Sequence, residues 1–170
     1  MRWLIASVFV ALAVSANWLA SRYTITVPFT TLIAPAGVLT IGAAFVLRDW
    51  LAQLAGFWWG VAVIPVAGGA SYLIGELAGW TSLQKIAVAS VAAFLASETL
   101  EAIVFQPIRR RSLTAGVLLS GMVGNALDSW LFLTLAFGSL AFFWGNFVGK
   151  AEMILIGAAL TAARRRLVPA

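Results

Sequence analysis

The sequence predicts an all-α integral membrane protein with six transmembrane helices and both termini in the cytoplasm. Of its 170 residues, 62% are hydrophobic and only 10% are charged, whereas soluble domains are about 45–50% apolar and about 25% charged. The apolar residues fall into six runs, each close to the roughly 20 residues that cross a bilayer. Basic residues are concentrated in alternate connections, as the positive-inside rule requires. We expect one multi-pass domain over residues 1–170, in the inner or plasma membrane.

The first three spans are expected at Trp3–Ala20, Leu32–Trp50 and Leu54–Gly75. The first is longer than the apolar region of a signal peptide, which is about 7–15 residues, so we expect it to be retained. A segment from Arg22 to Pro28 ends it with a basic residue and a proline. The segment Asp49–Gly56 carries the charge and glycine that separate the second span from the third.

The last three spans are expected at Ile86–Pro107, Leu113–Phe137 and Phe142–Ala163. Three consecutive arginines, Arg109–Arg111, separate the fourth from the fifth, and a short turn at Gly138–Ala141 precedes the sixth. Alternation of polar and apolar residues with a period of two does not recur, so the pattern favours helices over a β-barrel.

The orientation follows from the distribution of basic residues. With the N-terminus in the cytoplasm, only Arg22 and Lys85 lie outside, and Lys150 lies within a span. Such an asymmetry over short loops predicts orientation. Eight arginines then lie inside: Arg2, Arg48, Arg109, Arg110, Arg111, Arg164, Arg165 and Arg166.

Composition excludes several function classes. The chain contains no cysteine and no histidine, which excludes disulfides, thiolate chemistry, Cys/His metal sites and histidine acid–base catalysis. The net charge of +5 reflects few acids rather than a basic patch, so we expect no nucleic-acid partner. No G-x-x-x-x-G-K-[ST] motif for ATP occurs. We expect no catalytic residue, metal or cofactor.

Polar residues inside the spans mark the expected functional site, because an ionisable residue at mid-span costs a few kcal/mol or more. Residues three or four positions apart share a helix face, and several of these residues are so spaced. At about 1.5 Å per residue, Glu101 lies about 12 Å from Arg109 and Asp128 about 25 Å from Arg111. The candidates are Asn17, Glu98, Glu101, Asn125, Asp128, Asn146 and Lys150, while Glu152 points roughly away from Lys150. They predict one cavity for binding or translocation, or alternatively an ion-pair network that only holds helices together.

Several stretches resemble the queuosine-precursor transporters, also called the vitamin uptake transporter family. They are Ala93–Phe105, Ser120–Phe132, Gly145–Lys150, Ala16-Asn17, Pro35–Gly37 and Arg48–Trp50. The resemblance covers nearly the whole chain. The chain departs from the family in its shorter loops, in Glu101 where aspartate is common, and in Gln53 where an acid is usual.

The resemblance implies uptake of a 7-deazapurine such as 7-cyano-7-deazaguanine or its aminomethyl form. A guanine-like ring presents an N–H and an NH₂ side by side, which one carboxylate can accept together. Glu101 and Asp128 are the candidates for that edge. The candidates for the carbonyl and ring nitrogens are Asn125, Asn146, Asn17 and Lys150, while Glu98 serves Lys150 or a proton step.

Other interpretations stay open at this stage. The chain could be the substrate-binding subunit of an energy-coupling vitamin importer, with a separate ATPase as its partner. A structural envelope protein would tolerate neutral replacement of the mid-span acids. An intramembrane enzyme would use the paired carboxylates, although no nucleophile–histidine pair accompanies them. Besides substrate and membrane lipid, a second copy or an energising partner is open.

Overall fold

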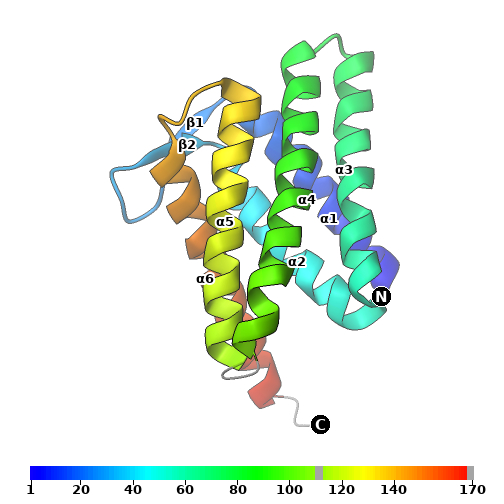
Figure 1. Cartoon of the computed structure of the whole chain (residues 1–170). Coiled ribbons are helices and arrows are strands. Elements are labelled where there is room, and N and C mark those ends of the chain that lie inside the picture. Colours follow the sequence, from blue (N-terminus) through cyan, green and yellow to red (C-terminus); the bar gives the residue numbers. More distant parts are fainter. Residues whose placement is uncertain (110–112, 168–170) are drawn as a thin grey trace.

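A computed structural model describes residues 1–109 and 113–167, with side chains described for residues 1–48, 50–52, 54–108 and 119–156. This part of the chain forms six helices and one two-stranded hairpin (Figure 1). The helices are α1 (Arg2–Ala20), α2 (Val38–Ala55), α3 (Phe57–Leu77), α4 (Thr81–Arg109), α5 (Leu113–Phe137) and α6 (Phe143–Leu167). The mostly helical class is confirmed, and α5 has the predicted bounds.

The second predicted span is wrong at its beginning, because residues 33–35 belong to a β-hairpin. Strand β1 (Thr24–Thr26) pairs antiparallel with β2 (Ile33–Pro35), with Thr26 opposite Ile33. The β-branched residues of both strands favour extended backbone, and Pro35 has no N–H to continue a helix ladder. The helix therefore begins at Val38 instead of Leu32.

The predicted break at Asp49–Gly56 is almost entirely helical. Helix α2 continues to Ala55, and α3 begins at Phe57, so Gly56 alone separates them. Gly56 has a φ of 100°, a conformation that glycine adopts without a Cβ clash. One glycine is sufficient to reverse the chain, so the end of α2 and the beginning of α3 lie at the same end of the helix bundle.

The helices run alternately up and down in Figure 1, and the hairpin lies at the upper end beside α6. Helix α4 packs along α5, and α1 packs against α2 and α3. The beginning of α1 and the end of α6 lie at the same, lower end, as an even number of spans requires. Which end faces the cytoplasm stays a prediction from charge. Arg110 and Arg111 lie outside the described residues, as do the side chains of Arg109 and Arg164–Arg166.

Two glycines let backbone segments approach closely near the hairpin. A Cβ at Gly37 would overlap the backbone carbonyl of Ala16 on α1, and one at Gly145 would overlap that of Ile33 on β2. The overlap in both cases is with backbone, which has little freedom to move. Gly37 therefore draws the start of α2 onto α1, and Gly145 draws α6 under the hairpin.

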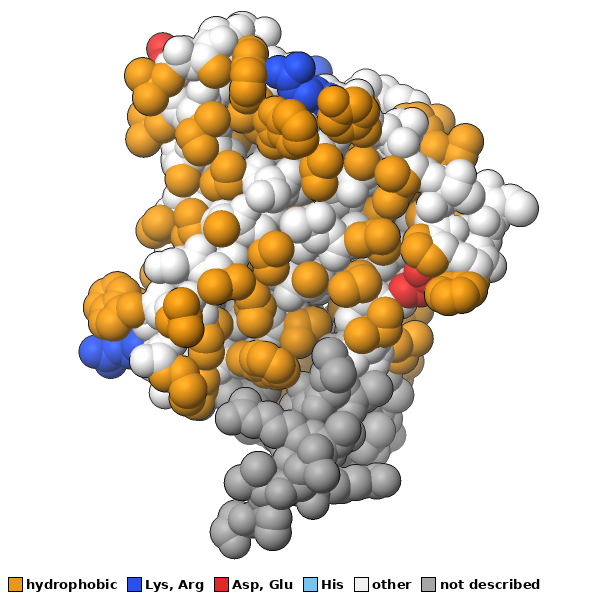
Figure 2. Space-filling view, turned by 180° about the vertical axis from the view of Figure 1, so that it is seen from behind, with side chains coloured by type: hydrophobic (Ala, Val, Ile, Leu, Met, Phe, Trp, Pro, Cys, Tyr) orange, Lys and Arg blue, Asp and Glu red, His pale blue; other side chains and the backbone are white. Residues whose placement is uncertain are grey.

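The surface is apolar, as a lipid environment requires. Hydrophobic side chains are spread over the whole described part of the face in Figure 2, and Lys and Arg lie near its upper and lower parts. Within the described residues, three helices are long and apolar enough to cross a membrane, at Arg2–Ala20, Phe57–Ala78 and Thr81–Ile108. That all six helices cross the membrane stays a prediction.

Candidate functional site

A small buried cavity lies where α1, α2, α4, α5 and α6 meet. Its volume is about 20 Å³, whereas one water needs about 10–15 Å³. Four of the residues predicted for the site line it, one from α1, one from α5 and two from α6. The lining residues are Ala16, Asn17, Ala20, Pro35, Gly37, Val38, Ile41, Ser90, Phe94, Asp128, Phe132, Asn146 and Lys150. The cavity is thus polar on its α5–α6 side and mostly apolar elsewhere.

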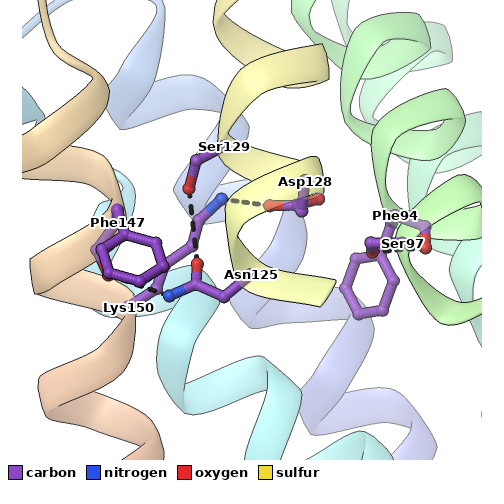
Figure 3. A network of polar contacts seen from close by, with 7 residues as sticks. All are labelled: Phe94, Ser97, Asn125, Asp128, Ser129, Phe147 and Lys150. Carbon is purple, nitrogen blue, oxygen red and sulfur yellow. Dashed lines mark hydrogen bonds and ion pairs between the residues drawn. The ribbon is translucent and has the colours of Figure 1, made fainter. Parts of the chain in front are cut away.

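A buried ion pair forms the polar wall of the cavity. Lys150 Nζ on α6 donates to Asp128 Oδ2 on α5 (Figure 3), and the two residues are only 2% and 4% exposed. The ammonium also lies 5.5 Å from the ring centroid of Phe132 and 5.8 Å from that of Phe45. Both distances are within the range of cation–π attraction. A charge pair this buried survives only because each partner compensates the other.

Asn146 adds a hydrogen-bond donor whose acceptor is missing from the described residues. It precedes Lys150 by one helical turn and is 1% exposed. Its Nδ2 is buried and has no hydrogen-bond partner among the side chains and backbone that the structure describes. Most buried polar groups in proteins have a partner, so an unpaired amide at a cavity wall points to a ligand acceptor or a water there.

Asn17 lies on the opposite wall and is held by α3. Its Nδ2 donates to Ser71 Oγ at 3.0 Å, and Ser71 in turn donates to the Ala67 carbonyl at 3.0 Å. Both Asn17 and Ser71 are buried. These bonds orient the Asn17 amide toward a fixed position, which is the requirement for a residue that positions a ligand.

Asn125 is near the ion pair but has a different partner. Its Nδ2 donates to the Phe147 carbonyl at 2.9 Å, and its Oδ1 accepts from Ser129 Oγ at 3.3 Å (Figure 3). It is not among the residues that line the cavity. These contacts tie α5 to α6 one turn from Asp128, so Asn125 supports the wall rather than facing the cavity.

The structure does not bring the two glutamates of α4 to the cavity. Glu98 is paired with Arg48 of α2, whose side chain is only 12% exposed. Glu101 is half-buried on the α4–α5 contact, where a Cβ at Gly124 would lie 3.2 Å from its Oε2. The seven predicted residues therefore separate into four on the cavity, one behind its wall, and two nearer the lower end of α4.

The partners of these residues leave little trace in the sequence. The positive-inside distribution predicts Arg48 as one of the arginines that flank the spans, whereas the structure pairs it with Glu98. Phe45, Phe94 and Phe132 gave no signal, since aromatic residues are frequent throughout the chain. Ser71 could have been found only from its depth in the third span, where a hydroxyl is costly without a partner.

A family model described as "Putative vitamin uptake transporter" matches residues 4–163. No curated protein and no solved structure matches the chain.

Proposed function

Because the chain belongs to the vitamin uptake transporter family, a family of multi-pass membrane proteins, we propose that it imports a 7-deazapurine such as 7-cyano-7-deazaguanine. The cavity lined by Asp128, Lys150 and Asn146 would be its binding site. The observation that carries this proposal is the buried Asp128–Lys150 pair beside the Asn146 amide, whose Nδ2 has no partner among the residues that the structure describes. Together they provide an acceptor and two donors on the α5–α6 wall of a cavity whose other polar lining residues are Asn17 and Ser90.

The hydrogen-bonding edge of a 2-amino-6-oxo ring fits this set of groups. The Asp128 carboxylate can accept the ring N–H and the adjacent NH₂ together, as charge-assisted hydrogen bonds. Lys150 and Asn146 can donate to the ring carbonyl and a ring nitrogen. Phe94 and Phe132, which line the same cavity, offer apolar faces against a flat heterocycle.

Among the acids, Asp128 is the better candidate for the donor edge. It lines the cavity, whereas Glu101 packs beside Gly124 at the α4–α5 contact. Lys150 would hold the Asp128 carboxylate until the N–H groups of a substrate replace the ammonium as donors. The carboxylate would therefore never lack a hydrogen-bond donor in the membrane. Glu98 and Asn125 would act through the helices they join, not by touching the substrate.

Binding requires the helices around the cavity to separate. Pockets for small ligands measure about 300–1,000 Å³, far more than the 20 Å³ of this cavity. The compact form described here would therefore alternate with a wider one, as alternating access demands.

The test is thermal stabilisation of the purified protein by a panel of ligands: 7-cyano-7-deazaguanine, its aminomethyl form, guanine, adenine and common vitamins. A ligand at 100 times its Kd stabilises by about 2.7 kcal/mol. We expect deazapurines with the 2-amino-6-oxo edge to stabilise, and adenine, which lacks it, to have no effect. If no deazapurine raises the melting temperature, the proposed substrate is wrong.

A pair of variants makes the test specific to the site. Asp128→Asn should abolish both the stabilisation and uptake in a host that needs the precursor. Glu101→Gln changes the same kind of group on the neighbouring helix, away from the cavity, and should leave the stabilisation in place. Loss in Glu101→Gln with retention in Asp128→Asn would move the site to the α4–α5 contact.

A further inference from the structure

We propose that two stacked pairs of side chains on α2 and α4, Phe45–Phe94 and Arg48–Glu98, form the gate between the cavity and the lower end of the bundle. The inference rests on the proposed transport function, but it concerns the path and not the substrate. It assigns a function to Glu98 and Arg48, which the binding site does not use.

The two pairs continue the cavity-lining faces of their helices. On α2, Ile41 lines the cavity, and Phe45 and Arg48 follow at positions four and seven, on the same face. On α4, Phe94 lines the cavity, and Glu98 follows four residues later, about 6 Å farther along the axis. The pairs are therefore two successive side-chain contacts, or layers, that join α2 to α4 on the side of the cavity toward the lower end of α4.

The aromatic layer closes the cavity directly. Phe45 and Phe94 meet edge to face with ring centroids 4.6 Å apart and planes at 88°, and both are buried. The Lys150 ammonium lies 5.8 Å from the ring centroid of Phe45, and the Arg48 guanidinium lies 5.7 Å from that of Phe94. One pair of rings thus separates the ion pair of the site from the second ion pair.

Beyond the second layer lies a much larger hollow. A groove of about 460 Å³ runs between the beginning of α3 and the lower part of α4, and Glu98 lines it together with Trp58 and Gln106. Phe94 lines the inner cavity and Glu98 lines this groove, although they are only one helical turn apart. The two layers therefore lie between the small inner cavity and the larger groove.

The chemistry of the barrier suits a gate. An ion pair between two helices holds them together, and it can be exchanged for hydration when they part. The aromatic rings exclude water while the gate is closed and need only a rotamer change or a small helix shift to open. Glu98 already lines the groove, so its carboxylate would face that groove when the pair separates.

Single-cysteine accessibility tests the gate without reference to the substrate. The chain has no native cysteine, so Ser90→Cys places one thiol on the cavity wall of α4. Ala93→Cys, on the same helix but packed against α5 residues Phe132 and Leu133, is the matched control. A membrane-impermeant methanethiosulfonate reagent is added to inverted membrane vesicles, and in parallel to spheroplasts.

Removing either layer should expose the cavity from one side. Glu98→Ala or Phe94→Ala should accelerate labelling of Ser90→Cys at least tenfold in inverted vesicles and leave it unchanged in spheroplasts. Labelling of Ala93→Cys should stay slow. The charge swap Arg48→Glu/Glu98→Arg should restore slow labelling of Ser90→Cys.

Three results would overturn the gate. The first is unchanged labelling of Ser90→Cys in both Glu98→Ala and Phe94→Ala. The second is equal acceleration of Ala93→Cys, which would mean general loosening of the bundle. The third is acceleration only from the membrane side on which the hairpin lies. A gate confirmed by labelling, with no stabilisation by any deazapurine, would retain the gate and reject the substrate.

Discussion

Replacing Lys150 with methionine should strongly destabilise this protein. Methionine keeps most of the side-chain length and removes the ammonium, so the Asp128 carboxylate loses the donor that holds it. Both side chains are nearly inaccessible, at 3% and 6% exposure, and breaking a buried pair from one side costs about 3–5 kcal/mol. For a domain of 150–250 residues, each kcal/mol corresponds to about 2–4 °C, so we expect the melting temperature to fall by about 6–20 °C.

The double variant Asp128→Asn/Lys150→Met separates the ion pair from simple packing. Replacing both charges removes the uncompensated group, and such replacements are often neutral or stabilising. We therefore expect the double variant to be more stable than Lys150→Met alone, with a coupling energy of about 2 kcal/mol or more. Lys85→Met is the matched control, because Lys85 is exposed and surface changes usually stay within about 0.5 kcal/mol.

Unfolding in detergent micelles can be followed through the fluorescence of the eight tryptophans. If Lys150→Met melts within about 3 °C of the unmodified protein, and the double variant shows no coupling, the pair is not the buried, mutually compensated unit described here. The polar wall of the cavity would then need another explanation.

Three further predictions concern single residues. Asn146→Ala should weaken ligand-induced stabilisation at least tenfold in apparent affinity with little loss of stability, because its Nδ2 has no partner among the described residues. Asn125→Ala, which loses the bond to the Phe147 carbonyl, should instead destabilise by about 1–3 kcal/mol; the reverse pattern would exchange their roles. Gly145→Ala should reduce the yield of folded protein, because its Cβ would overlap the Ile33 carbonyl, while Gly121→Ala, with open space around it, should not; equal yields would contradict the packing of the hairpin on α6. Phe29→Cys, at the fully exposed tip of the hairpin, should react with an impermeant thiol reagent in spheroplasts but not in sealed inverted vesicles, and the opposite result would invert the predicted topology.

The helical class and the approximate positions of the helices could be predicted from the sequence, because a span must satisfy its own backbone within hydrocarbon. That constraint is local, so runs of apolar residues reveal it. The bounds are predicted less well, since α4 begins at Thr81, five residues before the predicted Ile86. The prediction of helix bounds from apolar runs failed at residues 32–37, where Ile33–Pro35 pairs with Thr24–Thr26 as a second strand. That pairing joins two segments and cannot be read from either one alone. The prediction failed again at Asp49–Gly56, where one glycine sufficed for the turn.

The same distinction between local properties and contacts between segments applies to the polar residues. The sequence alone determined that seven polar residues inside the spans are costly in a membrane and therefore significant, because desolvation depends on residue type and depth. Only the tertiary structure decided their partners. It set Lys150 against Asp128, left the Asn146 amide at the cavity wall, and drew Arg48 from its predicted flank to Glu98. Pairing depends on the rotation and crossing of whole helices, and a one-dimensional pattern of hydrophobicity carries no record of which helix faces which.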